Sequence, residues 1–386
     1  MTSRERVVRT LKRQPVDRMP IDLGSHTSTG ISAFAYWNLR KHLGLSTHGI
    51  WVPDAVQVLA YVDDDIRQRF HLDCIMLEAP WPRPATWRPR DGYAFRIPAR
   101  MKPAKNESGD WIVRQGKQAM RMPPGGFFFD GAWLSYWGSG NADADLAVYA
   151  REAERVFKET PYATNFLGKG RGGGFSAFFG GVERAVQMLE DPKKVQEENR
   201  LLCEEYIRRA GKIIDLMGGY IQLLTVTDDM GMQQGPLCSP ALVEQCVAPY
   251  LKKFCGFVHR HSDIKVFMHN CGSIMPLIPI LIDCGVDVLN PVQVSAHNMD
   301  PRELKRKFGD KLVFWGGGCD TQNVLDKGSP QAVARNVREL ARTFKRGGGY
   351  VFSQVHNILG NVPPENIVAL LDTAYQESFY SSVTTR

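Results

Sequence analysis

Short apolar runs alternate with helical patterns along most of the chain. Each run is bounded by turn residues, and most are followed by a segment with apolar residues at helical spacing. Strands that alternate with helices favour a parallel sheet, and eight runs predict one closed (β/α)8 TIM barrel. An open Rossmann sheet is disfavoured because no G-x-G-x-x-G follows the first run. The runs are 20–24, 74–78, 163–168, 220–227, 265–269, 286–290, 311–315 and 349–353.

The helical segments carry clear start and stop signals. Asp191, Ser239 and Ser329 each precede a proline, which is typical of the residue that caps a helix. Glycines at 218–219 and 347–349 mark two of the helix ends. The pattern after Ser239 predicts one continuous helix that runs towards residue 259.

One stretch, at about 92–130, interrupts the alternation of strands and helices. Residues 111–115 and 118–122 have strand-like patterns and flank Gly116 and Lys117, which predicts an inserted β-hairpin after the second strand. The insertion is too short for a separate domain. Residues 1–386 are therefore expected to form a single barrel domain.

Composition limits the classes of protein to which this chain can belong. It has 386 residues, of which 43% are hydrophobic, and its formal net charge is +7. This charge suits an anionic ligand or an acidic partner protein, but the chain has no basic stripe or motif typical of nucleic-acid binding. No apolar run approaches the roughly 18 residues of a membrane span, and the first residues lack an apolar secretion core. We expect a cytoplasmic protein whose eight cysteines are reduced.

Metal-binding residue types follow several of the predicted strands. His269 and Cys271 stand two residues apart after the fifth strand, so their side chains project to one face. A nitrogen and a sulfur donor side by side suit zinc. Cys319 and His356 follow later strands and are further candidate ligands, and three ligands with one open position would be a catalytic arrangement. The alternative is a core cysteine beside a strand-end histidine.

Other polar residues occupy the same expected end of the barrel. Asp228 and Asp229 follow the fourth strand, and either carboxylate could act as a general acid or base or bind a substrate cation. A turn or cap role is the alternative, and Asp229 is the stronger functional candidate. Asn290 and Gln293 after the sixth strand, and His26 after the first, are candidate substrate-binding residues.

Taken together, these motifs resemble the uroporphyrinogen decarboxylase (URO-D) superfamily over about residues 2–375. The resemblance implies one (β/α)8 barrel. It is strongest from residue 225 onward, where Asp228-Asp229-Met-Gly-Met and His269-Asn-Cys271-Gly stand at typical places. The similar segments are 3–7, 15–20, 228–237, 265–273, 285–293, 314–318 and 363–367.

Two branches of that superfamily differ at the first strand and at the fifth. Decarboxylases carry an arginine-rich M-R-Q-A-G-R segment after the first strand, whereas residues 22–30 of this chain contain no arginine. Asp73 loosely matches the decarboxylases' catalytic aspartate. Cobalamin-linked methyltransferases carry H-x-C and a later cysteine, whose position falls at His356 here. The resemblance therefore leaves His356 or Cys319 as the third zinc ligand.

The methyltransferase branch gives the leading hypothesis for function. It implies a corrinoid-dependent, zinc-containing methyltransferase that moves a methyl group between a small methylated substrate or thiol and a corrinoid protein. Methylcobalamin would be carried on that separate protein, because no D-x-H-x-x-G segment is present. Asp229 and Gln293 would orient the small substrate.

Two other interpretations remain open. A carboxy-lyase similar to uroporphyrinogen decarboxylase would use Asp229 and Asp73 as acids. A binding barrel with a structural metal would use all four ligands, His269, Cys271, Cys319 and His356. The sequence leaves the methyl donor or acceptor, the direction of transfer and the oligomeric state open, a homodimer included.

Overall fold

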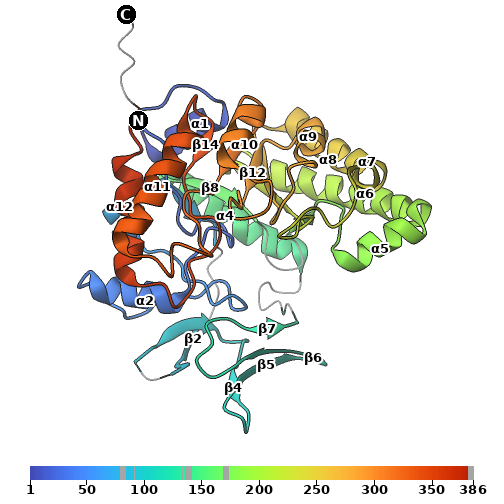
Figure 1. Ribbon diagram of the computed structural model, residues 1–386. Coiled ribbons are helices and arrows are strands. Elements are labelled where there is room, and N and C mark those ends of the chain that lie inside the picture. The colour runs from blue at the N-terminus through green and yellow to red at the C-terminus, as the bar shows by residue number, and fades with distance from the viewer. Residues whose placement is uncertain (79–83, 91, 133, 135–140, 168–173, 381–386) are drawn as a thin grey trace, which may run out of the picture.

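A computed structural model describes residues 1–78, 84–90, 92–132, 134, 141–167 and 174–380. Its centre is a curled parallel sheet with helices packed around it (Figure 1). A short strand, β9 (Phe175–Ser176), pairs with β10 outside the main path. The main path runs in the order β1 (Cys74–Met76), β8 (Ala163–Phe166), β10 (Leu223–Thr227), β11 (Lys265–His269), β12 (Val288–Asn290), β13 (Val313–Trp315) and β14 (Tyr350–Val351).

The first predicted strand, residues 20–24, contains one isolated bridge, at Ile21, rather than a regular strand. Ile21 pairs in parallel with Phe352, and the Phe352 N–H donates to the Pro20 carbonyl at 2.9 Å. On the other side the Asp73 N–H donates to the Ile21 carbonyl at 2.8 Å. This segment is therefore hydrogen-bonded to residues that adjoin β14 and β1, the two ends of the main strand path. The predicted α/β class is confirmed, and the sheet is TIM-barrel-like.

Twelve helices lie within the described residues, and none of them is long and apolar enough to span a membrane. The three predicted caps are present, since the side chains of Asp191, Ser239 and Ser329 each accept a backbone N–H. The helices are α1 (Ser3–Leu11), α2 (Ala33–His42), α3 (Asp64–Arg69), α4 (Ala142–Glu159), α5 (Val182–Glu190), α6 (Pro192–Met217), α7 (Pro240–Cys246), α8 (Ala248–His261), α9 (Ile278–Asp283), α10 (Pro301–Phe308), α11 (Pro330–Lys345) and α12 (Pro364–Gln376).

The single helix predicted after Ser239 is wrong. The structure has two helices, α7 and α8, and the chain breaks at Val247 between them. Pro249 lies in the first turn of α8, where its missing N–H costs nothing. A proline at this place starts a new helix more readily than it continues an old one.

The insertion contains the predicted hairpin and more. β5 (Trp111–Gln115) and β6 (Gln118–Met122) pair as expected, and β4 (Ala104–Lys105) and β7 (Asp130–Gly131) extend them to four antiparallel strands. Another pair, β2 (Pro84–Trp87) and β3 (Phe95–Pro98), begins before the predicted boundary at 92. Strands this short have no readable periodicity. Both small sheets lie together to one side of the main sheet and its helices (Figure 1).

The inside of the curled sheet is closed by apolar side chains at one end. Val7 and Leu11 of α1 pack against residues from most of the strands, including Phe267 and Trp315. This cluster fills the end at which the strands begin. The opposite end, where the strands finish, is where a fold of this kind places its chemistry.

Asp73 lies at the closed end and has a structural role. Its carboxylate is completely buried, and it accepts hydrogen bonds from Arg6 Nη1 at 2.6 Å, Arg18 Nη1 at 2.7 Å and the Ile21 N–H at 2.9 Å. Because it precedes β1 rather than following it, it does not face the strand ends. The expectation that Asp73 serves as a catalytic acid is corrected by this placement.

Replacing Asp73 by Asn should therefore lower stability without affecting chemistry at the other end. Removing one partner of a buried ion pair typically costs about 3–5 kcal/mol, because the remaining charges stay buried. Urea denaturation at neutral pH measures this loss. Asp283→Asn is the control, since its exposed pair with Lys252 at 2.9 Å should contribute less than about 1 kcal/mol. A stable Asp73→Asn protein would contradict the assignment.

Candidate metal centre

Three metal-capable side chains meet at the open end of the sheet. His269 ends β11, Cys271 follows it by two residues, and His356 lies in the segment after β14. One ligand atom from each lies within 4.8 Å of the others, and His269 Nε2 is 3.6 Å from Cys271 Sγ. Two nitrogens and one sulfur form a donor set that fits zinc. The H-x-C prediction thus corresponds to a real juxtaposition.

The His269 ring is oriented by the amide of Asn290. Parallel pairing of β11 and β12 places these two residues side by side. The Asn290 Nδ2 donates to the Trp315 carbonyl at 3.0 Å, so its Oδ1 faces His269 Nδ1 at 3.1 Å. A carbonyl oxygen can only accept, and Nδ1 must therefore carry the proton. In the neutral ring this leaves the lone pair of Nε2 directed at Cys271, as metal-bound histidines require.

The short loop that carries Cys271 is held from both sides. Asp229 Oδ1 accepts the Cys271 N–H at 2.9 Å, and Gln293 Oε1 accepts the Gly272 N–H at 2.8 Å. Gly272 has a positive φ of 88°, and a Cβ there would collide with the backbone of Gly231. Gln293, which we expected at the substrate, therefore positions the loop of the metal centre.

The two neighbouring aspartates have different roles. Asp228 accepts hydrogen bonds from the N–H groups of Phe179 at 2.9 Å and Gly180 at 3.1 Å. This corresponds to the structural alternative, in which the carboxylate satisfies backbone N–H groups. Burial raises the pKa of Asp228 to about 6. Asp229 instead places Oδ1 3.6 Å from His269 Nε2, and its side chain is 58% exposed. Asp229 is thus the carboxylate that a ligand at the cluster would meet.

The electrostatics of the cluster favour a bound cation. Burial, together with the nearby His269, lowers the pKa of His356 to about 4, so this ring is neutral and able to bind a metal at pH 7. Burial and the Asp229 carboxylate raise the pKa of the Cys271 thiol well above its usual range. Without a cation the thiol keeps its proton, and a divalent ion would reverse that preference.

The two alternative third ligands occupy different places. His356 belongs to the cluster, whereas Cys319 is fully buried in the main hydrophobic core and is not part of the group of ligand atoms found among the described residues. Burial raises the pKa of the Cys319 thiol. The geometry therefore favours His356 over Cys319 as the third donor.

His26 is buried next to His269. It is 3% exposed, and its ring centroid is 5.8 Å from that of His269. Its Nδ1 is 2.7 Å from the hydroxyl of Ser28, which donates to Asn290 Oδ1. Sequence reasoning missed Ser28, and the polar run that follows the first strand was the available signal.

The protein thus has a TIM-barrel-like sheet with a metal-capable cluster at its strand ends. Comparison with known proteins shows the family to which it belongs. Residues 182–376 match the family model "Uroporphyrinogen decarboxylase (URO-D)". The match covers half of the chain and includes all three residues of the cluster. The chain belongs to the uroporphyrinogen decarboxylase family.

Individual relatives are distant. The chain is 28% identical over 159 residues to a uroporphyrinogen decarboxylase of Pseudomonas fluorescens, covering 41% of this chain and 42% of that protein. It is 24% identical over 208 residues to that of Psychromonas ingrahamii, covering 52% and 54%. These matches span about half of the relatives' length or less.

A structural likeness extends over nearly the whole chain. A methyltransferase from Methanosarcina mazei superposes with a TM-score of 0.56 at 16% identity, covering 97% of this chain and 99% of that one. At this identity the likeness shows a shared fold.

Metal content should separate the two candidate third ligands. Purified anaerobically, the wild type should hold about one zinc per chain by elemental analysis, and Cys271→Ala and His356→Ala should lose it. Cys319→Ala is the matched control, because it removes a buried thiol outside the cluster. Loss of zinc from Cys319→Ala with retention in His356→Ala would reverse the assignment.

Asn290→Ala should weaken zinc binding although Asn290 is not a ligand. Loss of the group that orients a metal-bound histidine typically costs 10–100-fold in metal affinity. Competition with a chelator measures the affinity. Asn366→Ala is the control, because that buried amide also bonds backbone carbonyls, those of Leu325 and Gly328, at 2.9 and 2.8 Å. Equal affinities in the two variants would show that Asn290 does not orient the ring.

Proposed function

We propose that this protein is a zinc-containing, corrinoid-dependent methyltransferase. The observation that carries the proposal is the group formed by His269, Cys271 and His356, with ligand atoms within 4.8 Å of one another at the strand ends. Three ligands from the chain leave a fourth position for a substrate atom, as in catalytic zinc sites. The superposition with a methyltransferase over 97% of the chain is compatible with this activity.

The bound zinc would act as a Lewis acid, holding a thiol substrate as its thiolate or drawing electron density from an ether or amine heteroatom. The chain's own residues prepare that position. In the neutral ring of His269, Asn290 places the proton on Nδ1 and leaves Nε2 free to bind, and burial keeps His356 neutral. Asp229, whose carboxylate is exposed beside His269, would accept a proton or hydrogen bond from the substrate.

The first loop supports a small substrate rather than a porphyrinogen. Asp22 is completely buried and accepts the indole N–H of Trp315 at 2.9 Å, and Ser25 donates to the same carboxylate at 2.8 Å. The loop from 22 to 30 is thus folded into the protein, and it contains no arginine. It offers neither arginine nor lysine to pair with the propionate groups of a porphyrinogen.

The methyl group would be exchanged with a corrinoid on a separate protein. In the demethylating direction, the bond between the methyl carbon and the donor's heteroatom breaks. The heteroatom keeps the electron pair and takes up a proton, and the methyl group passes to the reduced corrinoid of the partner. The net charge of +7 suits an acidic partner surface.

A decarboxylase is the second candidate, and the family match favours it. Residues 182–376 fit the family model, and the relatives compared above are themselves named uroporphyrinogen decarboxylase. A decarboxylase needs neither the sulfur of Cys271 nor a metal. Loss of zinc would then leave its activity unchanged.

A transfer assay separates the two functions. Zinc-loaded protein, a reduced corrinoid protein and a panel of methylated ethers, amines and thioethers are combined without oxygen, and the corrinoid absorbance is followed. Methyl transfer that falls roughly 100-fold or more in Cys271→Ala, and not in Cys319→Ala, is the expected result. Release of carbon dioxide from uroporphyrinogen by both variants, without methyl transfer, would contradict the proposal.

A further inference from the structure

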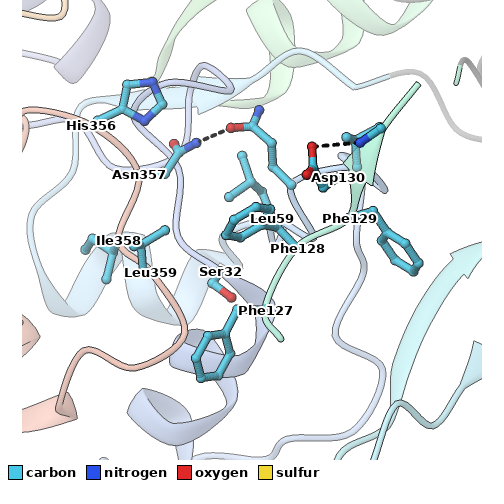
Figure 2. A pocket seen from close by; sticks show the side chains of 13 residues that line it. Ser32, Leu59, Phe127, Phe128, Phe129, Asp130, His356, Asn357, Ile358 and Leu359 are labelled. Carbon is cyan, nitrogen blue, oxygen red and sulfur yellow. Dashed lines mark hydrogen bonds between the residues drawn. The ribbon is translucent and has the colours of Figure 1, made fainter. Parts of the chain in front are cut away.

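His356, one residue of the metal-capable cluster, also lines a cavity of about 300 Å³ (Figure 2). The walls come from Ser32 and from three separated segments, which are 56–59, 127–131 at the end of the insertion, and 356–359 after β14. The volume is at the lower end of the range for small-molecule sites. Among the described residues of the cluster, His356 lines the cavity and His269 and Cys271 do not.

The described walls of this cavity are mainly apolar and carry no Lys or Arg. Leu59, Phe127, Phe128 and Leu359 are among the lining side chains. The only carboxylate among the described lining residues is that of Asp130, which is exposed and accepts the Gly131 N–H at 2.7 Å. Nothing here would compensate a buried anion, and uncharged ligands are favoured.

One aromatic ring is available to a ligand. Phe127 is fixed by an edge contact with Phe34 at 5.5 Å and by the Arg90 guanidinium, 4.8 Å from its centroid. Phe129 is buried against Trp87 at 5.7 Å. Phe128 is 51% exposed, and its ring contacts no other aromatic ring within the described part of the chain. A flat ligand ring could therefore stack on Phe128.

One polar group in the wall is unsatisfied. The Ser32 hydroxyl has no hydrogen-bond partner among the described residues, and the residue is 2% exposed (Figure 2). The amides nearby are already paired, since Asn357 Nδ2 donates to Gln57 Oε1 at 2.8 Å and Gln57 Nε2 donates to Asp54 Oδ2 at 3.1 Å. A ligand oxygen beside Ser32 would satisfy its hydroxyl.

We propose that this cavity binds an uncharged methoxy-substituted aromatic ring, and hence that the methyl donor is a methyl aryl ether. The ring would stack on Phe128, and a second ring oxygen would bond to Ser32. The methoxy group would lie towards His356. This inference rests on the proposed methyl transfer and names its substrate class. Phe128 and Ser32 are specificity-determining residues outside the metal centre.

Binding tests the inference without metal or corrinoid. Ligand-observed NMR titration gives dissociation constants for guaiacol, a methoxyphenol, and for anisole, which lacks the second oxygen. Phe128→Ala should weaken both by about tenfold, and Phe128→Trp should restore them. Phe379→Ala is the matched control, because Phe379 is 49% exposed but does not line the cavity. Its affinities should equal those of the wild type.

Ser32→Ala tests the hydrogen bond by comparing the two ligands. Guaiacol should bind about fivefold more weakly to the variant, whereas anisole should bind unchanged. A merely structural role for Ser32 would weaken both ligands equally. The ratio of the two dissociation constants is therefore the informative measurement.

Three results of the binding experiments would overturn the inference. They are no binding of either ether, equal weakening in Phe379→Ala, and tighter binding of tetramethylammonium than of guaiacol. The last would assign the cavity to methylated cations held by Asp130. Methyl transfer from a non-aromatic donor would leave the proposed function intact and refute this substrate class. Binding as expected without methyl transfer would support the ligand class of the cavity and contradict the proposed function.

Discussion

The amide of Asn290 provides the interactions on which the candidate metal centre depends. It lies completely buried at the end of β12, donates to the Trp315 carbonyl at the end of β13, and accepts from His269 at the end of β11 and from Ser28 in the first loop. One side chain therefore connects three adjacent strands and the segment that bridges the sheet edges. The proton on Nδ1 of His269 follows from this geometry, and so does the availability of Nε2 to a metal.

Burial sets the chemistry of the cluster as much as the choice of ligands does. A desolvated His356 stays neutral, and a desolvated Cys271 beside a carboxylate keeps its proton. Both groups reach their metal-binding forms together only when a cation balances the thiolate. The insertion adds a second environment next to the first, because the segment between β6 and β7 contributes Phe127 and Phe128 to the wall that contains His356. Gly360 allows this approach, since a Cβ there would collide with the ring of Phe127.

Much of this could be predicted from the sequence, and the failures have physical causes. Helix caps and the H-x-C pair are local patterns, and parallel strands bring their ends together wherever they occur, so the sequence could place His269, Cys271 and Asp229 near one another. Asp73 was assigned to the site by a loose motif match, yet it lies at the closed end, and the hydrogen bond from the Gly272 N–H to Gln293 could not be read from a local pattern. The strands of β4 and β7 are two residues long and have no periodicity to detect.

The sequence by itself determined the α/β class, the strand ends that carry polar residues, and the nitrogen and sulfur pair on one face of an extended segment. These properties arise from neighbours along the chain. Only the tertiary structure decided that His356 rather than Cys319 completes the group, because residues some 85 positions apart meet through the curvature of the sheet. It also decided that Ser32 and Phe128 share one cavity. Burial and distance belong to the packed molecule, and no local pattern encodes them.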